Sequence, residues 1–262
     1  MLKMQDFSMD PKEGNATPSL KLGFTVLKCL IEASSSLGVS QVATQTGLPK
    51  ATAFRILRAF HQLGYVEQQP ASRKYFLSPQ IFGFFHYLTS HFHPTEKASL
   101  FIRETARELR CSIYLSMLAG RHSYVVCASG PFGDTTILGS SGPAYATSCG
   151  KVLIAQLPES AWADFAPQEG DVAVTSRTNL DPVRYLEEIR QAAQSGVAWN
   201  ERETSAYFSV AAPVKELCRQ SRMAVALLFP YADWVIQDRE TLRQQVLKIA
   251  RELSTRLNPG AA

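Results

Sequence analysis

Long apolar runs are missing from this sequence. No stretch of the 262 residues approaches the roughly 18 apolar residues that a membrane-spanning helix needs. The N-terminus, MLKMQDFSMDPKEGNATPS, lacks the apolar segment of a secretory signal. It mixes charged residues with Pro, Gly, Asn and Ser, so we expect residues 1–18 to form a flexible tail. These absences predict a cytoplasmic protein with no membrane partner.

Cysteine is scarce, and its number is odd. The five residues are Cys29, Cys111, Cys127, Cys149 and Cys218. No Cys-x-x-Cys pair occurs, which argues against a disulfide framework and predicts reduced, buried thiols. His86, His91 and His93 lie close together, but no ligand spacing accompanies them. We therefore expect no metal ion and no other cofactor.

The C-terminal two-thirds of the chain has no excess of charge of either sign. Residues 79–262 hold 18 basic and 18 acidic side chains, whereas residues 19–78 hold seven basic and two acidic ones, a net charge of +5. Phosphate contacts from Lys and Arg supply most of the sequence-independent affinity for DNA. The charge distribution therefore indicates a small DNA-binding domain joined to a neutral larger domain.

The stretch from Ser40 to Gly64 has the pattern of a helix-turn-helix. A short apolar-periodic helix, with Ser40 as its expected N-cap, ends at Gly47. A Leu48-Pro49 connection leads to a second helix from Lys50 to Leu63. Short extended runs at 65–66 and 75–77 flank a basic turn and form a wing, and a support helix is expected from Ser19. We therefore predict a winged helix-turn-helix domain at residues 19–79 that binds a double-stranded DNA operator.

The second helix and the wing supply the candidate DNA contacts. Arg55 is expected to contact a guanine in bidentate fashion, and Thr52 a base edge or a phosphate. The whole set is Ser40, Gln41, Lys50, Ala51, Thr52, Arg55, Arg58, Arg73 and Lys74. An alternative is a three-helix module whose solvated basic face contacts protein.

The segment QIFGFFHYLTSH at residues 80–91 is apolar on more than one helical side. Such a helix must be buried on more than one side. We therefore predict a linker helix at residues 80–94, ended by Pro94, that packs against a neighbouring subunit in a homodimer or homotetramer.

Residues 95–258 alternate between helical and extended patterns. We expect strands at 111–118 and 122–129 joined as a hairpin, two more within VAWNERETSAYFSVAAPV, and an all-apolar strand at 223–230. Helices are expected at 96–110, 149–157 (started by Thr147 or Ser148), 182–195 and 238–257. The pattern indicates an α+β fold with a mostly antiparallel sheet.

Three stretches resemble the IclR family of transcriptional regulators: TGLPKATAFRILRAFHQLGYVE, PAYATSCGKVLIAQLP and GVAWNERETSAYFSVAAPV. The resemblance runs from about Ser19 to Leu257. It implies a winged helix-turn-helix, a dimerising linker helix and a C-terminal GAF-like domain that binds a small organic effector. Members are commonly dimers or tetramers that repress or activate catabolic operons.

The resemblance also implies an effector site. Its residues in this chain would be Ser148, Cys149, Trp199, Asn200, Ser209, Ala226 and Leu228. Relatives often have small polar residues where Ala226 and Leu228 stand here, a His at Tyr145 and a Gly at Ala206. These departures argue against a small hydrophilic acid. Together with Tyr114, Tyr124 and Trp199, which we expect nearby, they favour an aromatic or more hydrophobic effector.

Two alternatives remain open from the sequence. Ala226 and Leu228 could only seal a core, which would leave a ligand-independent DNA-binding protein. The second alternative is an enzyme that uses the pocket near Cys149, because a cysteine at the start of a helix has a lowered pKa when it is exposed. However, no partner His or Asp is placed by the sequence, and a P-loop would need Gly at Tyr145 and Ser or Thr at Val152. We therefore expect no catalytic activity.

Overall fold

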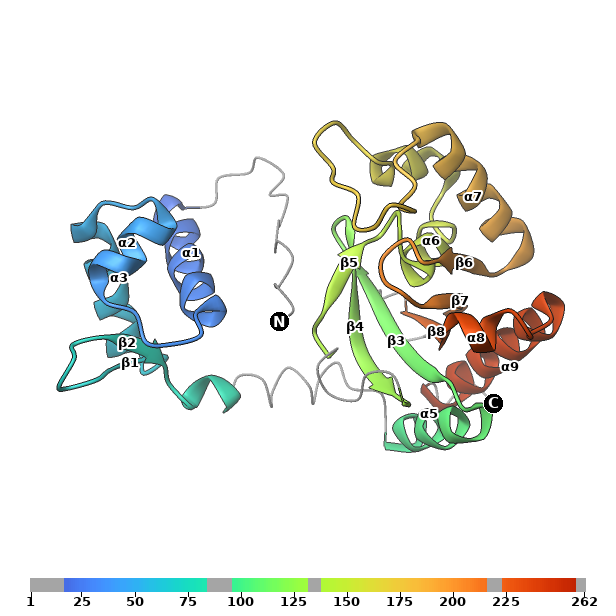
Figure 1. The fold of residues 1–262 in the computed structure, drawn as a ribbon, viewed down its shortest axis with the longest axis horizontal. Coiled ribbons are helices and arrows are strands. Elements are labelled where there is room, and N and C mark those ends of the chain that lie inside the picture. Colours follow the sequence, from blue (N-terminus) through green and yellow to red (C-terminus); the bar gives the residue numbers. More distant parts are fainter. Residues whose placement is uncertain (1–16, 84–95, 132–137, 216–222, 258–262) are drawn as a thin grey trace. The chain divides into compact units, whose positions relative to one another are not determined.

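The computed structural model describes residues 17–83, 96–131, 138–215 and 223–257 (Figure 1). The chain divides into two compact units, Met1–Phe92 and His93–Ala262. The tail expected at residues 1–18 lies almost wholly outside the described residues. The same holds for most of the linker helix expected at 80–94, of which residues 80–83 are described and helical.

Three helices and a two-stranded sheet form the N-terminal unit. They are α1 (Pro18–Glu32), α2 (Val39–Thr46), α3 (Lys50–Gln62), β1 (Val66–Gln68) and β2 (Tyr75–Leu77). The strands pair antiparallel, with Val66 opposite Leu77. Side chains from all five elements are buried in one core, among them Val26, Val42, Leu57, Val66 and Tyr75. The predicted winged helix-turn-helix is confirmed.

The turn between α2 and α3 depends on Gly47. This residue has φ 69° and ψ 12°, and its N–H bonds the carbonyl of Ala43, which ends α2 as expected. The predicted start at Ser40 is wrong, because the N-cap is Gly38, whose backbone N–H donates to the side-chain oxygen of Gln41 at 2.9 Å. Likewise α1 begins at Pro18, not after a Ser19 cap, because proline is pre-set for the first helical position.

A six-stranded antiparallel sheet forms the centre of the C-terminal unit, in the order β5-β4-β3-β8-β7-β6. The strands are β3 (Ser112–Ala119), β4 (His122–Ser129), β5 (Ser141–Pro143), β6 (Ala198–Glu201), β7 (Phe208–Val214) and β8 (Met223–Phe229). The helices are α5 (Glu96–Leu109), α6 (Ser148–Ile154), the 3-10 helix η1 (Glu159–Phe165), α7 (Pro182–Ser195), α8 (Tyr231–Trp234) and α9 (Arg239–Leu257). The predicted α+β class and antiparallel sheet are confirmed.

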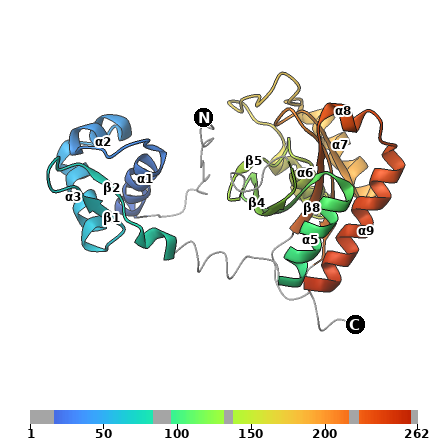
Figure 2. The ribbon, with the colours of Figure 1, turned by 60° about the horizontal axis from the view of Figure 1, so that its bottom comes forward.

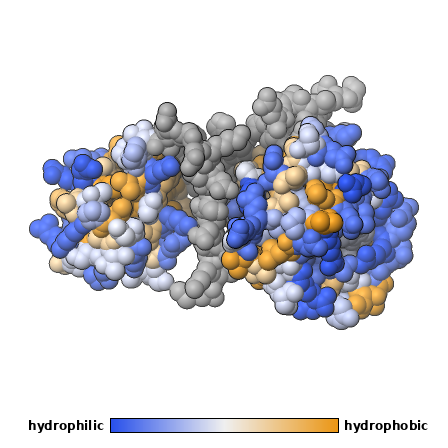
Figure 3. Space-filling model, turned by 90° about the horizontal axis from the view of Figure 1, so that it is seen from above, coloured by the Kyte–Doolittle hydropathy of each residue, from blue (hydrophilic) through white to orange (hydrophobic). Residues whose placement is uncertain are grey.

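Helices cover both faces of this sheet. Helices α5 and α9 lie side by side on one face (Figure 2) and share a core with it. On the other face, α6, η1 and α7 pack over a second core. We call these the α9 face and the α6 face. Apolar side chains also reach the surface of both units, where orange patches interrupt the blue in Figure 3.

The composition of β8 explains why α6 lies close to the sheet. Along MAVALLF the side chains alternate: Val225 and Leu227 belong to the core of the α9 face, and Ala224 and Ala226 to that of the α6 face. The small alanines leave room for α6. At Gly150 an added Cβ would collide with the backbone of Ala144, in the segment that leads from β5 into α6. A glycine is therefore needed in the first turn of α6.

Candidate functional site

The outer face of α3 is basic. Ala51, Arg55 and Arg58 follow one another at intervals of four and three residues, and all are exposed, whereas Ala53 and Leu57 are buried. Side chains at this spacing lie on one helical face. Arg55 and Arg58 therefore project from the exposed side of the helix that a winged helix-turn-helix places in the major groove. Lys50 is exposed at the start of the helix, and Thr52 is half-buried at the edge of this face.

The wing holds its two basic residues on an ordered turn. Arg73 has a left-handed φ of 56°, and its carbonyl accepts a hydrogen bond from Nε2 of Gln68 at 2.9 Å. The N–H of Gln69 bonds the carbonyl of Lys74 at 2.8 Å. Both basic side chains are exposed. Ser40 and Gln41 are exposed on α2, although the amide oxygen of Gln41 also caps that helix.

In the C-terminal unit, a hydroxyl pair joins α6 to the sheet. The Oγ atoms of Ser148 and Ser209 lie 2.7 Å apart, and both side chains are buried. Ser209 is opposite Asn200 on β6 and Leu228 on β8. Directly opposed residues of antiparallel strands share a face. The structure thus brings together six of the seven expected effector residues: Ser148, Cys149, Asn200, Ser209, Ala226 and Leu228.

Trp199 does not belong to this group, and its assignment to it was wrong. Successive side chains of a strand point to opposite faces, so Trp199 and Asn200 cannot both face α6. Trp199 packs in the core of the α9 face, where its ring centroid lies 5.6 Å from that of Trp234.

The two tyrosines that we expected near this group lie on opposite faces of the sheet. Tyr114 pairs with Ala226 and therefore lies on the α6 face, where it is half-buried like Leu228. Tyr124 pairs with Met117, which packs with the core of the α9 face. The side chains of Tyr114 and Leu228 are thus both partly accessible on the α6 face, which also holds the buried hydroxyl pair.

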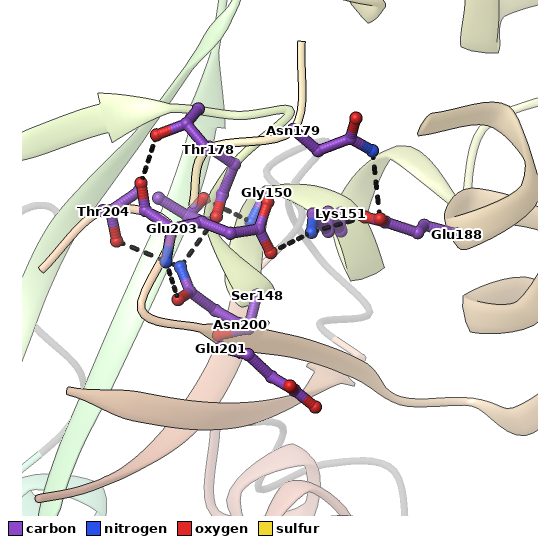
Figure 4. Close-up of polar contacts among 12 residues, drawn as sticks. Ser148, Gly150, Lys151, Thr178, Asn179, Glu188, Asn200, Glu201, Glu203 and Thr204 are labelled. Atoms are coloured by element: carbon purple, nitrogen blue, oxygen red, sulfur yellow. Dashed lines mark hydrogen bonds and ion pairs between the residues drawn. The ribbon is translucent and has the colours of Figure 1, made fainter. Parts of the chain in front are cut away.

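Asn200 is occupied with holding the loop after β6. Its Nδ2 donates to the carbonyl of Ala146 at 2.7 Å and to Oγ1 of Thr204 at 3.0 Å. Its Oδ1 accepts from the N–H of Glu203 at 3.0 Å (Figure 4). These bonds tie the loop to the segment that leads into α6.

Burial raises the pKa of the Cys149 thiol to about 12. Its Sγ donates to the carbonyl of Ala224 at 3.8 Å, deep between α6 and the sheet. The nucleophile in cysteine chemistry is the thiolate. A thiol with this pKa stays protonated at neutral pH, so Cys149 is not an activated nucleophile.

The sequence reasoning missed a buried ionic cluster beside this face. Nζ of Lys151 lies 2.5 Å from Oε1 of Glu203 and 2.6 Å from Oε2 of Glu188, and Figure 4 shows the ammonium between the two carboxylates. Glu188 also accepts from Nδ2 of Asn179 at 3.0 Å. Desolvation raises the pKa of Glu203 despite the attraction of Lys151. A lysine inside the apolar run CGKVLIAQL was a signal that could have revealed this cluster.

Lys151 cannot bind a phosphate group as the lysine of a P-loop does, because its ammonium group is buried and paired with two carboxylates. Within the described ranges, no three His, Cys, Asp or Glu side chains are grouped so that they could hold a metal ion. His86, His91 and His93 fall outside these ranges. A search of the described helices finds none that is both long and apolar enough to cross a membrane.

Comparisons with known proteins agree with this arrangement. Residues 19–70 match the IclR helix-turn-helix domain, and residues 86–255 match the family described as bacterial transcriptional regulator IclR C-terminal. The chain belongs to the IclR family of transcriptional regulators. A curated relative, the glycerol operon regulatory protein of Streptomyces griseus, is 31% identical over 81% of this chain and 84% of its own length. The HTH-type regulator XynR of Escherichia coli is 25% identical over 90% and 96%.

Solved structures of the family share the fold. The IclR transcriptional regulator of Alicyclobacillus acidocaldarius has a TM-score of 0.72 at 22% identity and covers 92% of this chain and 99% of its own. An IclR homologue of Microbacterium hydrocarbonoxydans, crystallised with 4-hydroxybenzoate, has a TM-score of 0.71 at 15% identity and covers 92% and 100%.

Proposed function

We propose that this regulator changes its affinity for an operator when a small aromatic or largely apolar metabolite binds over the α6 face of its C-terminal unit. The observation that carries the proposal is the grouping on that face. A buried hydroxyl pair, Ser148 and Ser209, adjoins the half-buried side chains of Leu228 and Tyr114. Ligand sites commonly combine an apolar lining with a few convergent polar groups.

The chemistry of the lining favours a ring over a small hydrophilic acid. Ala226 and Leu228 offer no hydrogen bonds, whereas the ring of Tyr114 can stack on another ring. The two serine hydroxyls can bond one polar substituent. A phenolic or similarly substituted aromatic compound fits these features. The 4-hydroxybenzoate in the structure of the Microbacterium homologue is a compound of this class.

On the DNA side, we propose that Arg55 reads a base while Lys50, Arg58, Arg73 and Lys74 contact phosphates. Exposure and spacing support these roles. Ser40, Gln41, Ala51 and Thr52 would complete the contact surface. A single unit offers few base contacts, so we propose a cytoplasmic homodimer or homotetramer that binds two half-sites. The relation to the glycerol operon regulatory protein points to a catabolic operon as the target.

An operator selected from random DNA provides the test. Its affinity for the protein would be measured by fluorescence anisotropy with and without each of a panel of aromatic acids, phenols and short hydroxy acids. We expect a thermal shift and a change in operator affinity with an aromatic member, because a ligand that prefers one state stabilises it. If only short hydroxy acids act, the aromatic class is wrong. If the operator is bound but no compound acts, the ligand-independent alternative holds.

No catalytic role is proposed for this site. The thiol of Cys149 is protonated and buried, and Lys151 is neutralised by two carboxylates. Neither side chain is available as a nucleophile or a base.

A further inference from the structure

A second pocket opens on the α9 face of the sheet, beside edge strand β6. Its volume is about 510 Å³. Its base is aromatic: Phe208 and Trp234 stack with centroids 5.1 Å apart and 20° between the rings. Both are buried, whereas Tyr231, 5.7 Å from Phe208, is 61% exposed. The pocket therefore has an apolar floor and one accessible ring at its side.

Three arginines line the same pocket, Arg177, Arg202 and Arg239, together with one acidic residue, Glu201. Arg239 is paired with Glu201 and lies over the rings of Trp199 and Trp234, 5.4 and 5.9 Å from their centroids. Glu201 accordingly points away from the Lys151 cluster in Figure 4. With four charged groups in its lining, the pocket has a net charge of +2.

Two of these cations have no carboxylate partner among the described residues. Across the described ranges, neither Arg177 nor Arg202 has a carboxylate oxygen within 4.0 Å. Guanidinium groups bind carboxylates through a planar fork of donors. The lining of the pocket thus combines aromatic residues with two arginines that have no carboxylate partner in the described part of the chain.

The backbones that carry these two arginines are fixed to each other. Oγ1 of Thr175 donates to the carbonyl of Arg202 at 2.7 Å and accepts from the N–H of Arg177 at 3.1 Å. Arg202 also has a left-handed φ of 70°, a backbone conformation that is unfavourable for a residue with a side chain. The surrounding contacts hold this conformation, so the position from which its side chain departs is set before any ligand arrives.

From these contacts we propose that this pocket is a second ligand site, which binds a small aromatic carboxylate. The ring lies against Tyr231, Phe208 and Trp234, and the carboxylate faces Arg177 and Arg202. The site differs from the one over Ser148 and Ser209 because the sheet separates them. Arg239, which lies over the rings of Trp199 and Trp234, would pair with Glu201 and so reduce the repulsion between that carboxylate and the bound anion.

The three tryptophans of the chain allow a direct test. Trp234 lines the pocket and Trp199 packs against Trp234, whereas the indole N–H of Trp162 donates to the carbonyl of Leu157 in the core of the α6 face. The full-length protein, labelled with ¹⁵N in its indoles, would be titrated with benzoate and followed by NMR. We expect a saturable shift of the Trp234 indole signal with benzoate, and little or no shift with benzyl alcohol or acetate.

Two variants of the protein test whether the carboxylate of bound benzoate contacts Arg177 and Arg202. In the double variant Arg177→Gln and Arg202→Gln, we expect the benzoate Kd from the Trp234 signal to rise at least about tenfold, as for lost charged hydrogen bonds. Arg251→Gln, an exposed arginine twelve residues after Arg239 on α9, serves as the control and should leave the Kd unchanged. Both arginines of the double variant are exposed, so its spectrum should otherwise match that of the wild type.

The proposal is overturned by no shift of Trp234 at millimolar benzoate, by an equal shift with benzyl alcohol, or by an unchanged Kd in the double variant. A shift confined to Trp162 would also overturn it, because binding would then involve the α6 face alone.

Discussion

Lys151 and Glu203 form a buried ion pair, 2.5 Å between Nζ and Oε1, in the wall beside the α6 face. Their side chains are 3% and 10% exposed. Glu188 on α7 completes the cluster, so one ammonium group joins α6, α7 and the loop after β6. Removing one partner of such a group leaves a buried charge without compensation.

Lys151→Met should therefore destabilise the C-terminal unit by about 3–5 kcal/mol, because two carboxylates would be left without their cation. All three tryptophans lie in this unit, so urea unfolding followed by tryptophan fluorescence reports on it alone. Lys248→Met, at an exposed position of α9, is the control and should change stability by no more than about 0.5 kcal/mol. Equal effects of the two substitutions would mean that the cluster does not stabilise the fold.

Glu203→Gln should change how stability depends on pH. Because the pKa of Glu203 is raised in the folded protein, the folded state holds this proton more tightly than the unfolded chain does. The resulting stabilisation is present below the usual pKa of 4.5 and is lost as pH rises through the raised value. The unfolding free energy of the wild type, minus that of the variant, should thus fall with rising pH in this range. A difference that rises with pH instead would show that Lys151 lowers the pKa of Glu203 below its usual value.

Arg55→Ala should weaken binding to a selected operator by roughly 1–3 kcal/mol, the value of a bidentate base contact, with a smaller loss on random DNA. Fluorescence anisotropy at a fixed salt concentration measures the affinity for the selected operator and for random DNA. Lys21→Ala removes one exposed charge from α1 of the same unit and serves as the control. An equal loss on specific and random DNA would make Arg55 a phosphate contact.

Gly47→Ala should destabilise the helix-turn-helix by about 1 kcal/mol, because alanine is strained at a left-handed φ even where its methyl group meets open space. Hydrogen–deuterium exchange of peptides from α2 and α3 should become several-fold faster. Gly23→Ala, inside α1, is the matched control, because φ at Gly23 is not left-handed and an added methyl group comes no closer than 3.7 Å to its nearest neighbour, Phe60. Similar acceleration in both variants would rule out the left-handed turn as the cause.

Leu228→Ala should change the response to an aromatic effector while the protein without effector still binds its operator. Leu228 is half-buried, so the substitution removes lining without opening the deep core. The effector concentration that half-releases the operator measures the response, and Val183→Ala, exposed on α7, is the control. Loss of folding would favour a purely structural role for Leu228.

Periodicity in the sequence was enough to predict the winged helix-turn-helix, the hairpin of β3 and β4, and α7 with its glycine stop at Gly196. These elements are long or have strong end signals. It missed β5, η1 and α8, which are too short to show a period. The resemblance placed Trp199 beside Asn200 in one site, although neighbours on a strand face opposite ways. The Lys151 cluster joins three separated segments, so only tertiary structure reveals its partners.

The alanines on the α6 face have a consequence for how such a regulator diverges. Ala211 and Ala226 are opposed across β7 and β8, and Tyr114 follows on β3 in the same row. Ala211 and Ala226 are buried beneath α6 and have to stay small, whereas the half-buried Tyr114 can change without altering the backbone or the opposite face. Ligand preference could thus change by a single substitution at Tyr114, while the helix that reads DNA stays the same.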